Sequence, residues 1–353
     1  MRHAVLFRAL ALTACSLCLL VVVLGAYVRL SAAGLGCPDW PGCYGHLTPA
    51  AAATDIHSAS GSAAQIAASS GLPLEMGKAW REMLHRYAAS TLGLLILCLT
   101  LMTLLWRRER IAPARLVLAL LGIVLVQGLF GMLTVTWRLN PLIVTLHLLF
   151  GLTTLSLLWW LMLELMQRRE GSHPGRPPAG DGEALARPLA LLALVALVLQ
   201  IALGGWTSSN YAAIACPDLP TCQGRWWPDA DFHSAYSLWH AAVDAPALVA
   251  IHLTHRIGAM VASAALLAAA LTALWRRRDP LVRRPAIAVL AMLALQLTLG
   301  VSMVLRGFPL WLATAHNAGA ALLLLATLWL NNSLRTLPAA AGRPVWVPSI
   351  PPP

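Results

Sequence analysis

Long apolar runs separated by short polar stretches dominate the chain. Eight of these runs are long enough for a helix to cross a bilayer, which takes about 20 residues. The first run is uninterrupted and no Ala-x-Ala-like cleavage site follows it, so we interpret it as a retained helix rather than a signal peptide. The pattern predicts an all-α integral membrane protein whose eight transmembrane helices fall near residues 9–28, 79–105, 116–136, 142–163, 188–207, 248–274, 286–305 and 310–331.

The two halves of the chain carry the same motifs in the same order. Each half contains a two-cysteine motif, a His-Arg pair, a glutamine and a lone histidine within an apolar run, and the copies are offset by 169 to 179 residues. Such ordered repetition indicates an internal duplication. We therefore expect two tandem, pseudo-symmetric four-helix bundles, marked by the motifs 37–43 and 216–222, the pairs 85–86 and 255–256, Gln127 and Gln296, and His147 and His316.

A polar stretch rich in proline and glycine separates the two halves. We expect an N-terminal four-helix half over residues 1–167, a flexible cytoplasmic linker over 168–187 and a C-terminal four-helix half over 188–335. The proline-rich end of the chain, 336–353, is predicted to be a disordered tail.

Composition and charge agree with this reading. Hydrophobic residues make up 59% of the 353 residues and charged residues 11%. With the N-terminus in the cytoplasm, 17 of the 25 lysines and arginines fall on the cytoplasmic side, as the positive-inside rule requires. The net charge of +11 is then a topology signal, which argues against a nucleic-acid partner. It predicts that both chain ends are cytoplasmic and that the cysteine motifs lie on the outer side.

The cysteine pairs fall in the long outer loops. Five residues, two of them prolines, separate Cys37 from Cys43 and Cys216 from Cys222. Such a short, turn-rich segment can bring its ends within disulfide range, and the outer side of the membrane favours oxidation. A structural clip and a thiol pair that exchanges electrons both fit this arrangement. Pairing between the two loops also stays open, because four cysteines allow three connectivities.

Four histidines lie inside the predicted membrane helices, where a histidine is costly unless it has a partner. His85 and His147 in the first half, and His255 and His316 in the second, are expected at matching depths, roughly 8–10 Å below the outer surface. Two neutral imidazoles facing each other across a four-helix bundle suit the axial positions of a haem iron. Packing histidines bonded to Ser or Thr are the alternative. Zinc is disfavoured, because no third ligand lies at the same level in both halves.

The halves differ one helical turn outward of the His-Arg pair. Glu82 in the first half corresponds to His252 in the second, on the same face of the helix. A carboxylate beside a haem can accept or position a proton, or stabilise a developing cation. The first half is therefore predicted to be the reactive one. The structural alternative for Glu82 is an ion pair with Arg81 or Arg86.

Three arginines complete the candidate site. Arg86 and Arg256 directly follow a histidine and are placed to neutralise haem propionates near the outer interface. Arg29, eight residues before the first cysteine motif, is replaced by Ser208 in the second half, so it adds an electrostatic group to the first half alone.

The segment from Gly25 to Cys43, Gly-Ala-Tyr-Val-Arg-Leu-Ser-Ala-Ala-Gly-Leu-Gly-Cys-Pro-Asp-Trp-Pro-Gly-Cys, is followed by Glu82-x-x-His85-Arg86. This combination resembles the heme A synthase family of bacteria and mitochondria, and the resemblance extends over about residues 9–331. It implies an oxidoreductase that oxidises the C8 methyl group of heme O to a formyl group through a hydroxymethyl intermediate. The product, heme A, serves cytochrome oxidase biogenesis.

The resemblance also implies roles for individual residues. Glu82 would be the catalytic carboxylate, His85 and His147 would bind the iron of the substrate heme O, and His255 and His316 would hold the iron of a heme b cofactor. The cysteines match the subset of the family with loop disulfides. The implied setting is a bacterial inner membrane with periplasmic cysteine loops. Implied partners are the lipid bilayer, heme O synthase and cytochrome oxidase assembly factors; a homo-oligomer stays open.

Other protein classes were weighed against this resemblance. A di-haem b-type electron-transfer protein would hold two permanent haems and need no carboxylate unique to one half, so Glu82 argues against it. A haem transporter or chaperone would exchange its haem, which two fixed histidine pairs disfavour. A thiol-oxidising membrane protein would use the cysteines but leave the four histidines without a role.

Overall fold

The computed structural model describes residues 2–58, 61–109, 111–170, 183–237, 243–276 and 280–335, and every regular element within them is helical. Among these residues eight helices are long and apolar enough to cross a membrane, which confirms the predicted all-α membrane class. This is a multi-pass membrane protein. The eight helices are α1 (Arg2–Leu30), α4 (Met76–Leu105), α5 (Ala114–Thr136), α6 (Pro141–Glu170), α7 (Glu183–Ser209), α9 (Ala245–Arg276), α10 (Pro280–Leu305) and α11 (Leu310–Arg335).

Helices α4 and α9 begin three residues before the apolar runs that predicted them, because polar groups start each helix. In α4, the Glu75 carbonyl accepts the first helical N–H groups and the Glu75 carboxylate pairs with Lys78 at 2.8 Å. In α9, the Asp244 carboxylate accepts the N–H of Ala247 at 3.0 Å, a typical N-cap. His85 and His255 therefore lie about 14–15 Å along their helices from the first residue.

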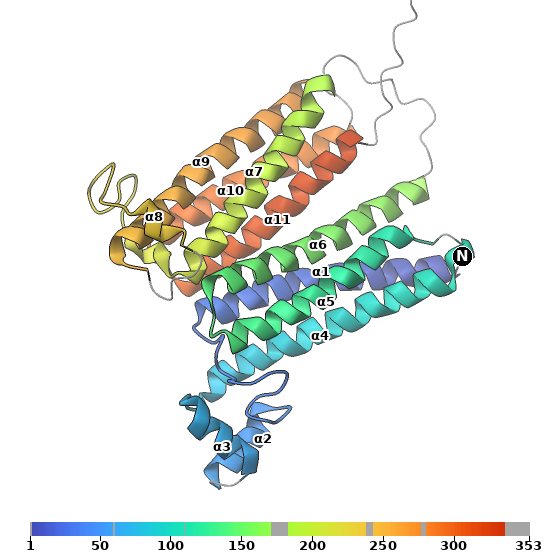
Figure 1. Cartoon of the computed structure of the whole chain (residues 1–353). Coiled ribbons are helices and arrows are strands. Elements are labelled where there is room, and N and C mark those ends of the chain that lie inside the picture. The colour runs from blue at the N-terminus through green and yellow to red at the C-terminus, as the bar shows by residue number, and fades with distance from the viewer. Residues whose placement is uncertain are drawn as a thin grey trace, which may run out of the picture.

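The helices are arranged as two groups of four that lie side by side. Figure 1 shows α1, α4, α5 and α6 together, and α7, α9, α10 and α11 beside them. Helices α1 and α6 of the first half pack against α7 and α11 of the second. Polar side chains join the halves: the Trp159 indole donates to the Leu325 carbonyl at 3.0 Å, and Gln167 Nε2 donates to Asn332 Oδ1 at 2.5 Å.

The buried core runs continuously through both halves and is built from leucines and small residues. Leu155, Leu158 and Leu161 on α6 are fully buried, and alanines such as Ala190 on α7 and Ala269 on α9 let neighbouring helices approach closely. Small residues at helix contacts are expected in a membrane, where apolar burial itself gives little drive for helices to associate. This core occupies the end of the molecule away from the cysteine loops.

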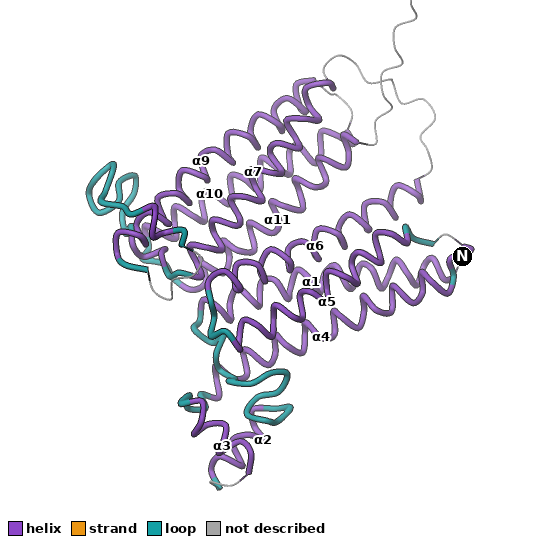
Figure 2. The backbone as a smooth tube through the Cα atoms, in the orientation of Figure 1, coloured by secondary structure: helices purple, strands orange, loops and turns teal. Residues whose placement is uncertain are grey.

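Both cysteine loops lie at the same end of the molecule, opposite the N-terminus (Figure 2). The segment between Cys43 and α4 contains α2 (Pro49–His57) and α3 (Gly61–Ser70). In the corresponding loop of the second half, the described residues form η2 (Ala212–Ala215) and α8 (Phe232–Ala235). A further short element, η1 (Arg107–Glu109), follows α4 at the other end.

The predicted linker and tail fall largely outside the described residues. Helix α6 extends to Glu170 and α7 begins at Glu183, so the structure describes both ends of the interval 168–187 as helical. The interval 336–353 lies wholly outside the described residues.

Candidate active site

The four predicted histidines form one pair in each half. His85 lies on α4 and His147 on α6, two helices that both pack against α1 and α5 and so face each other across the bundle. His255 on α9 and His316 on α11 have the same relation in the second half. The structure therefore places the two histidines of each predicted pair on helices that face each other.

Each of these histidines packs against a glycine on a neighbouring helix. A Cβ atom on any of the four glycines would lie 2.9–3.3 Å from the histidine Cε1 atom, closer than ordinary contact. The missing side chain lets the helix backbone approach the imidazole ring closely. The glycine–histidine contacts are Gly25 with His85, Gly131 with His147, Gly204 with His255 and Gly300 with His316.

The donor set fits a haem iron. Each half presents two imidazoles held by helix backbone, and two axial nitrogens are what a six-coordinate haem takes from protein. Within the part of the chain that the structure describes, no three His, Cys, Asp or Glu side chains gather as a metal site.

The surroundings of His255 differ from those of the other three histidines. Nδ1 of His85, of His147 and of His316 is buried and has no hydrogen-bond partner among the described residues. Nδ1 of His255 lies 3.0 Å from the amide nitrogen of Gln200, which also donates to the His255 carbonyl at 3.0 Å. Gln296 Nε2 lies 3.3 Å from His316 Nε2, so the repeated glutamine does contact the lone histidine of its half.

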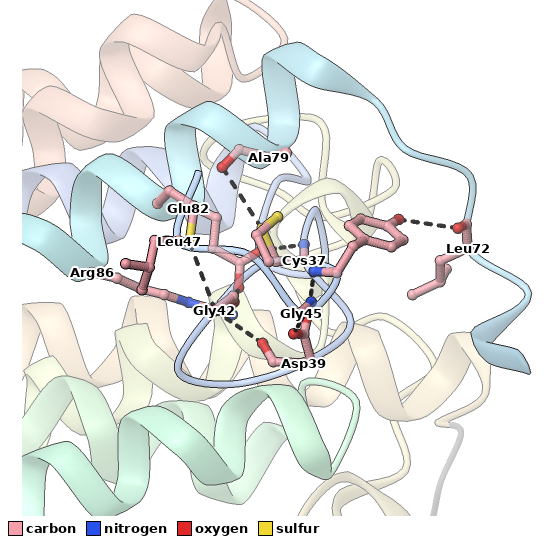
Figure 3. The surroundings of a disulfide bond; sticks show 12 residues. Cys37, Asp39, Gly42, Gly45, Leu47, Leu72, Ala79, Glu82 and Arg86 are labelled. Carbon is pink, nitrogen blue, oxygen red and sulfur yellow. Dashed lines mark hydrogen bonds and ion pairs between the residues drawn. A yellow bond between two sulfur atoms is a disulfide. The ribbon is translucent and has the colours of Figure 1, made fainter. Parts of the chain in front are cut away.

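Glu82 is buried, with 4% of its surface exposed. Its Oε1 accepts a hydrogen bond from Arg86 Nη2 at 2.5 Å, and its Oε2 accepts one from the backbone N–H of Cys37 at 3.0 Å (Figure 3). Of the two ion-pair partners that the sequence offered, Arg86 is the one used. Arg81 instead donates to the carbonyl of Gly77 in its own helix. Both carboxylate oxygens of Glu82 are thus held, as a buried charge requires.

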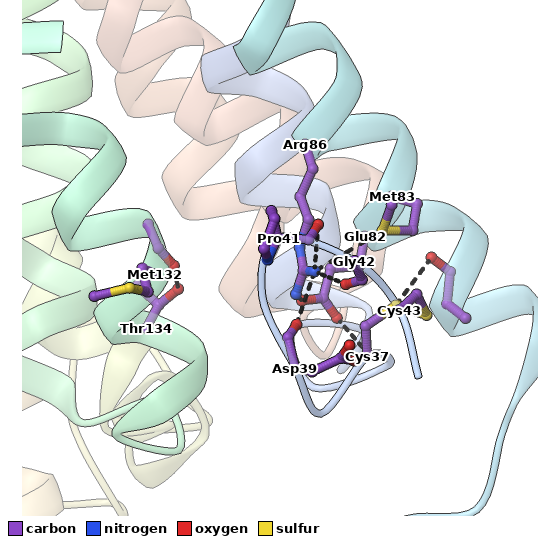
Figure 4. A network of polar contacts seen from close by, with 12 residues as sticks. Cys37, Asp39, Pro41, Gly42, Cys43, Glu82, Met83, Arg86, Met132 and Thr134 are labelled. Carbon is purple, nitrogen blue, oxygen red and sulfur yellow. Dashed lines mark hydrogen bonds and ion pairs between the residues drawn. A yellow bond between two sulfur atoms is a disulfide. The ribbon is translucent and has the colours of Figure 1, made fainter. Parts of the chain in front are cut away.

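Arg86 joins this carboxylate to the first cysteine loop. Its Nη1 donates to the carbonyls of Asp39 at 2.9 Å and Pro41 at 3.3 Å, and also to the carbonyl of Gly42 (Figure 4). The guanidinium group therefore lies between Glu82 and the loop, with most of its donors used by protein groups.

The second half keeps the arginine but lacks the carboxylate. Arg256 donates to the carbonyls of Thr221 at 2.8 Å and Cys216 at 2.9 Å, so it also binds its cysteine loop. His252, at the position of Glu82, lies 3.3 Å from Arg256 Nε through its Nε2 atom. Loop binding by the arginine is common to both halves, whereas the buried carboxylate belongs to the first half alone.

Each loop contains its own disulfide, Cys37–Cys43 and Cys216–Cys222, which settles the connectivity that the sequence left open. An aspartate organises each loop. Asp39 accepts the N–H groups of the two residues after Cys43 at 2.6 and 2.7 Å, and Asp218 does the same after Cys222 at 2.6 and 3.0 Å. The Thr221 hydroxyl and these N–H groups lower the pKa of Asp218.

The first disulfide is covered by the longer loop that follows it. Cys37, Cys43 and Tyr44 are fully buried in a cluster with residues of α2, α3 and the first turns of α4. The Tyr44 hydroxyl donates to the carbonyl of Leu72 at 3.0 Å (Figure 3), and burial raises the pKa of Tyr44. His46 and Asp55 pair at 2.7 Å across the same cover. The inserted segment therefore packs on the disulfide of the first half, whereas the second disulfide is equally buried without such a segment.

Arg29 lies at the contact between the halves. Its Nη2 donates to the carbonyls of Ser208 and Ser209 at 3.1 and 3.0 Å, and its guanidinium lies 4.0 Å from the centre of the Tyr211 ring. These carbonyls end α7, where a positive charge is favourable. Ser208 is the residue that replaces Arg29 in the repeat, so the arginine binds the backbone of its own counterpart.

Sequence reasoning missed the glycines and the Cys37 amide. The glycines carried a usable signal: Gly25 and Gly204 share the 179-residue offset of the cysteine motifs, and Gly131 and Gly300 share the 169-residue offset of the lone histidines. The Cys37 amide carried none, because a backbone N–H is the same at every residue except proline.

Comparison with known proteins agrees with this geometry. Residues 8–328 match the family of cytochrome oxidase assembly proteins designated COX15-CtaA. The chain is 42% identical over 328 residues to the heme A synthase of Shewanella oneidensis, which covers 90% of this chain and 93% of that protein. The heme A synthase of Erythrobacter litoralis is 30% identical over 340 residues, covering 90% of this chain and 93% of the relative. The heme A synthase of Caulobacter vibrioides is 33% identical over 258 residues, covering 69% of this chain and 70% of the relative.

Proposed function

Because this chain belongs to the heme A synthase family of cytochrome oxidase assembly proteins, we propose that its N-terminal half oxidises the substrate and its C-terminal half carries a resident haem. The protein is an oxidoreductase that converts heme O to heme A. The finer assignment concerns which residues do this. His85 and His147 hold the substrate heme O, Glu82 is the catalytic carboxylate, and His255 and His316 hold a heme b.

One observation carries the assignment of the reactive half. Both halves have the histidine pair and an arginine bound to a cysteine loop, but only the first has a buried carboxylate at the shared position, Glu82 in place of His252. A resident electron carrier has no need of a group that takes up protons. The half with the carboxylate is therefore the half where the methyl group reacts.

The second half supports a permanently bound haem. Gln200 Nε2 lies 3.0 Å from His255 Nδ1 and Gln296 Nε2 lies 3.3 Å from His316 Nε2, so each histidine of this half adjoins a glutamine. When bound, heme b supplies a one-electron relay for electrons taken from the substrate.

The chemistry on the substrate is two successive two-electron oxidations. In each, a C–H bond of the C8 carbon is broken, the oxygen of one water is added, and two protons and two electrons are released. The first gives the hydroxymethyl group, and the second gives a gem-diol that loses water to become the formyl group. Glu82 accepts a proton at its carboxylate oxygen or stabilises the developing cation, while Arg86 and the Cys37 amide hold it.

The arginines keep an electrostatic role in this proposal. Arg256 donates to backbone carbonyls, which are neutral and leave its positive charge available to a propionate. Arg86 shares its charge with Glu82, so only the remainder would act on a propionate in the first half. Arg29 stands beside Tyr211 at the contact between the halves and adds its charge there. The two disulfides stay candidates for a part in the reaction, either as structural clips or as an electron-exchanging pair.

We infer the cellular setting from charge and family. The excess of arginine on the side of the N-terminus supports a bacterial inner membrane protein with cytoplasmic ends and periplasmic cysteine loops. The prenylated substrate favours entry from the lipid bilayer or direct transfer from heme O synthase. Cytochrome oxidase assembly factors would receive the product, and a homo-oligomer is compatible with this arrangement.

The test is the haem content of the purified protein, co-expressed with a source of heme O, by extraction and chromatography. Glu82→Gln should keep heme b and bound heme O while forming no heme A or hydroxylated precursor. Glu75→Gln, on an exposed carboxylate at the start of the same helix, is the matched control and should behave as the parent. Normal heme A formation by Glu82→Gln would refute the assignment.

A further inference from the structure

We propose that the backbone of Gly36 and Cys37 is a positioning device for Glu82, and that the first disulfide loop serves the reaction by holding this backbone in place. The proposal rests on the assignment of Glu82 as the catalytic carboxylate. Gly36 is then a positioning residue: it touches neither substrate nor cofactor, and it acts through the Cys37 N–H and Glu82.

The close approach of the loop to α4 depends on the missing side chain of Gly36. A Cβ atom at this position would lie 2.6 Å from the carbonyl carbon of Lys78 and 2.8 Å from the backbone nitrogen of Ala79. These atoms belong to the helix backbone and cannot rotate away as the tip of a side chain can. Only glycine lets the loop lie here, and this brings the Cys37 N–H to 3.0 Å from Glu82 Oε2.

The second half shows the same loop without this device. Gly36 corresponds to Ala215, at the 179-residue offset of the cysteine motifs, and Glu82 corresponds to His252. There Arg256 donates to the carbonyls of Cys216 and of Thr221, the counterpart of Gly42. The glycine and the carboxylate thus occur together in the first half and are both absent from the second. Ala215 also indicates that a Cβ at this position is compatible with disulfide formation.

Several contacts hold the Cys37 amide in position. The disulfide joins Cys37 to Cys43, Arg86 binds three carbonyls of the loop, and the cover of α2 and α3 packs on the disulfide. A hydrogen bond from an N–H group to a carboxylate is stronger than a hydrogen bond between neutral groups, and it is also directional. With Arg86 on one oxygen and Cys37 on the other, the carboxylate has one orientation.

Gly36→Ala tests this inference. To reach ordinary contact the Cβ must move by most of an ångström, and a shift of about 1 Å in a catalytic group costs roughly 100-fold in rate. We expect kcat for heme O oxidation to fall about 100-fold while KM changes less than about threefold. Heme b content and the count of free thiols should match the parent. Gly34→Ala, whose Cβ meets only the flexible Leu139 side chain at 3.2 Å, is the control and should keep the parent kcat.

A double variant separates positioning from other effects. If Gly36 acts through Glu82, then Gly36→Ala adds little further loss of kcat in a Glu82→Asp background, where the acid is already withdrawn from the Cys37 N–H. An intact disulfide together with lost turnover would distinguish positioning from electron relay, since a relay needs only the two sulfurs. Parent-like kcat in Gly36→Ala, or a second full loss in the double variant, would overturn the inference.

The experiments distinguish failure of the proposed function from failure of the positioning inference. If the parent makes no heme A, or Glu82→Gln is fully active, the proposed function itself fails. If Glu82→Gln is inactive but Gly36→Ala is not impaired, only the positioning inference fails. If the Gly36→Ala variant loses heme b or its disulfide, the Glu82→Asp variant is measured in its place. That variant keeps an acid but withdraws it by one methylene from the Cys37 N–H, and unaltered kcat there would equally overturn the inference.

Discussion

Replacing Arg86 by leucine should destabilise the protein mainly through the carboxylate left behind. The side chains of Arg86 and Glu82 are 12% and 6% exposed, so the pair is buried. Removing one partner of a buried ion pair costs about 3–5 kcal/mol, because the remaining charge is uncompensated. The chain offers an internal comparison, since Arg256 makes equivalent loop contacts beside a histidine. Arg256→Leu loses only hydrogen bonds, at a cost of about 1–3 kcal/mol.

The assay is unfolding in mixed detergent micelles titrated with sodium dodecyl sulfate and followed by the fluorescence of the 14 tryptophans. Arg86→Leu should be less stable than Arg256→Leu by about 2 kcal/mol. Adding Glu82→Gln to Arg86→Leu should recover about 2 kcal/mol, because the amide carries no charge to bury. Equal losses for the two arginine variants, with no recovery in the double variant, would refute the reasoning that desolvation of Glu82 dominates.

Three further predictions concern other parts of the structure. Gly204→Val should lower heme b content several-fold, because even a Cβ there would lie 3.1 Å from His255 Cε1. Gly122→Ala, at a helical glycine with open space around it, should leave heme b content unchanged. Haem extraction followed by chromatography measures the heme b content of both variants. Arg29→Ala should cost about 1.5–3 kcal/mol in the same unfolding titration, because two carbonyls at the end of α7 lose a charged donor, whereas exposed Arg306→Ala should change stability little. The pKa of Tyr44 is raised from 10.0 by burial and by nearby carboxylates, so its contribution to stability is fully present below about pH 10 and is lost as the pH rises through the folded-state pKa. Protease cleavage in the α2–α3 cover should therefore increase at alkaline pH. Tyr44→Phe should remove this dependence on pH. Any change in cleavage of Tyr44→Phe at neutral pH then measures the loss of the hydrogen bond to Leu72.

Residue chemistry alone identified the histidine pairs and the carboxylate. A histidine or glutamate inside an apolar run is conspicuous, because burying it is costly without a purpose. The internal repeat then reduced the number of candidate residues, because Glu82 is distinguished only by comparison with its counterpart His252. The same comparison would have identified Gly25, Gly131, Gly204 and Gly300, but a glycine in a membrane helix is common enough to pass unnoticed.

The arginines illustrate contacts that the sequence does not predict. Their position directly after a histidine suggested a haem propionate as partner, yet in both halves the guanidinium binds carbonyls of a loop about 40 residues away in sequence. An arginine has five donors and takes acceptors from whatever the fold brings near. Carbonyl groups leave no trace in the sequence, so this partner could not be read from it.

Hydropathy, charge and repetition therefore determined the membrane class, the eight helices, the two-fold organisation and the pairing of histidines. Each of these depends on how single residues partition between water and lipid, a property that survives in a linear sequence. Tertiary structure alone decided that each disulfide closes its own loop, that Arg29 joins the halves, and that Gly36 lets the Cys37 amide reach Glu82. Those contacts join backbone groups to distant side chains, and their geometry exists only once the helices and loops have packed.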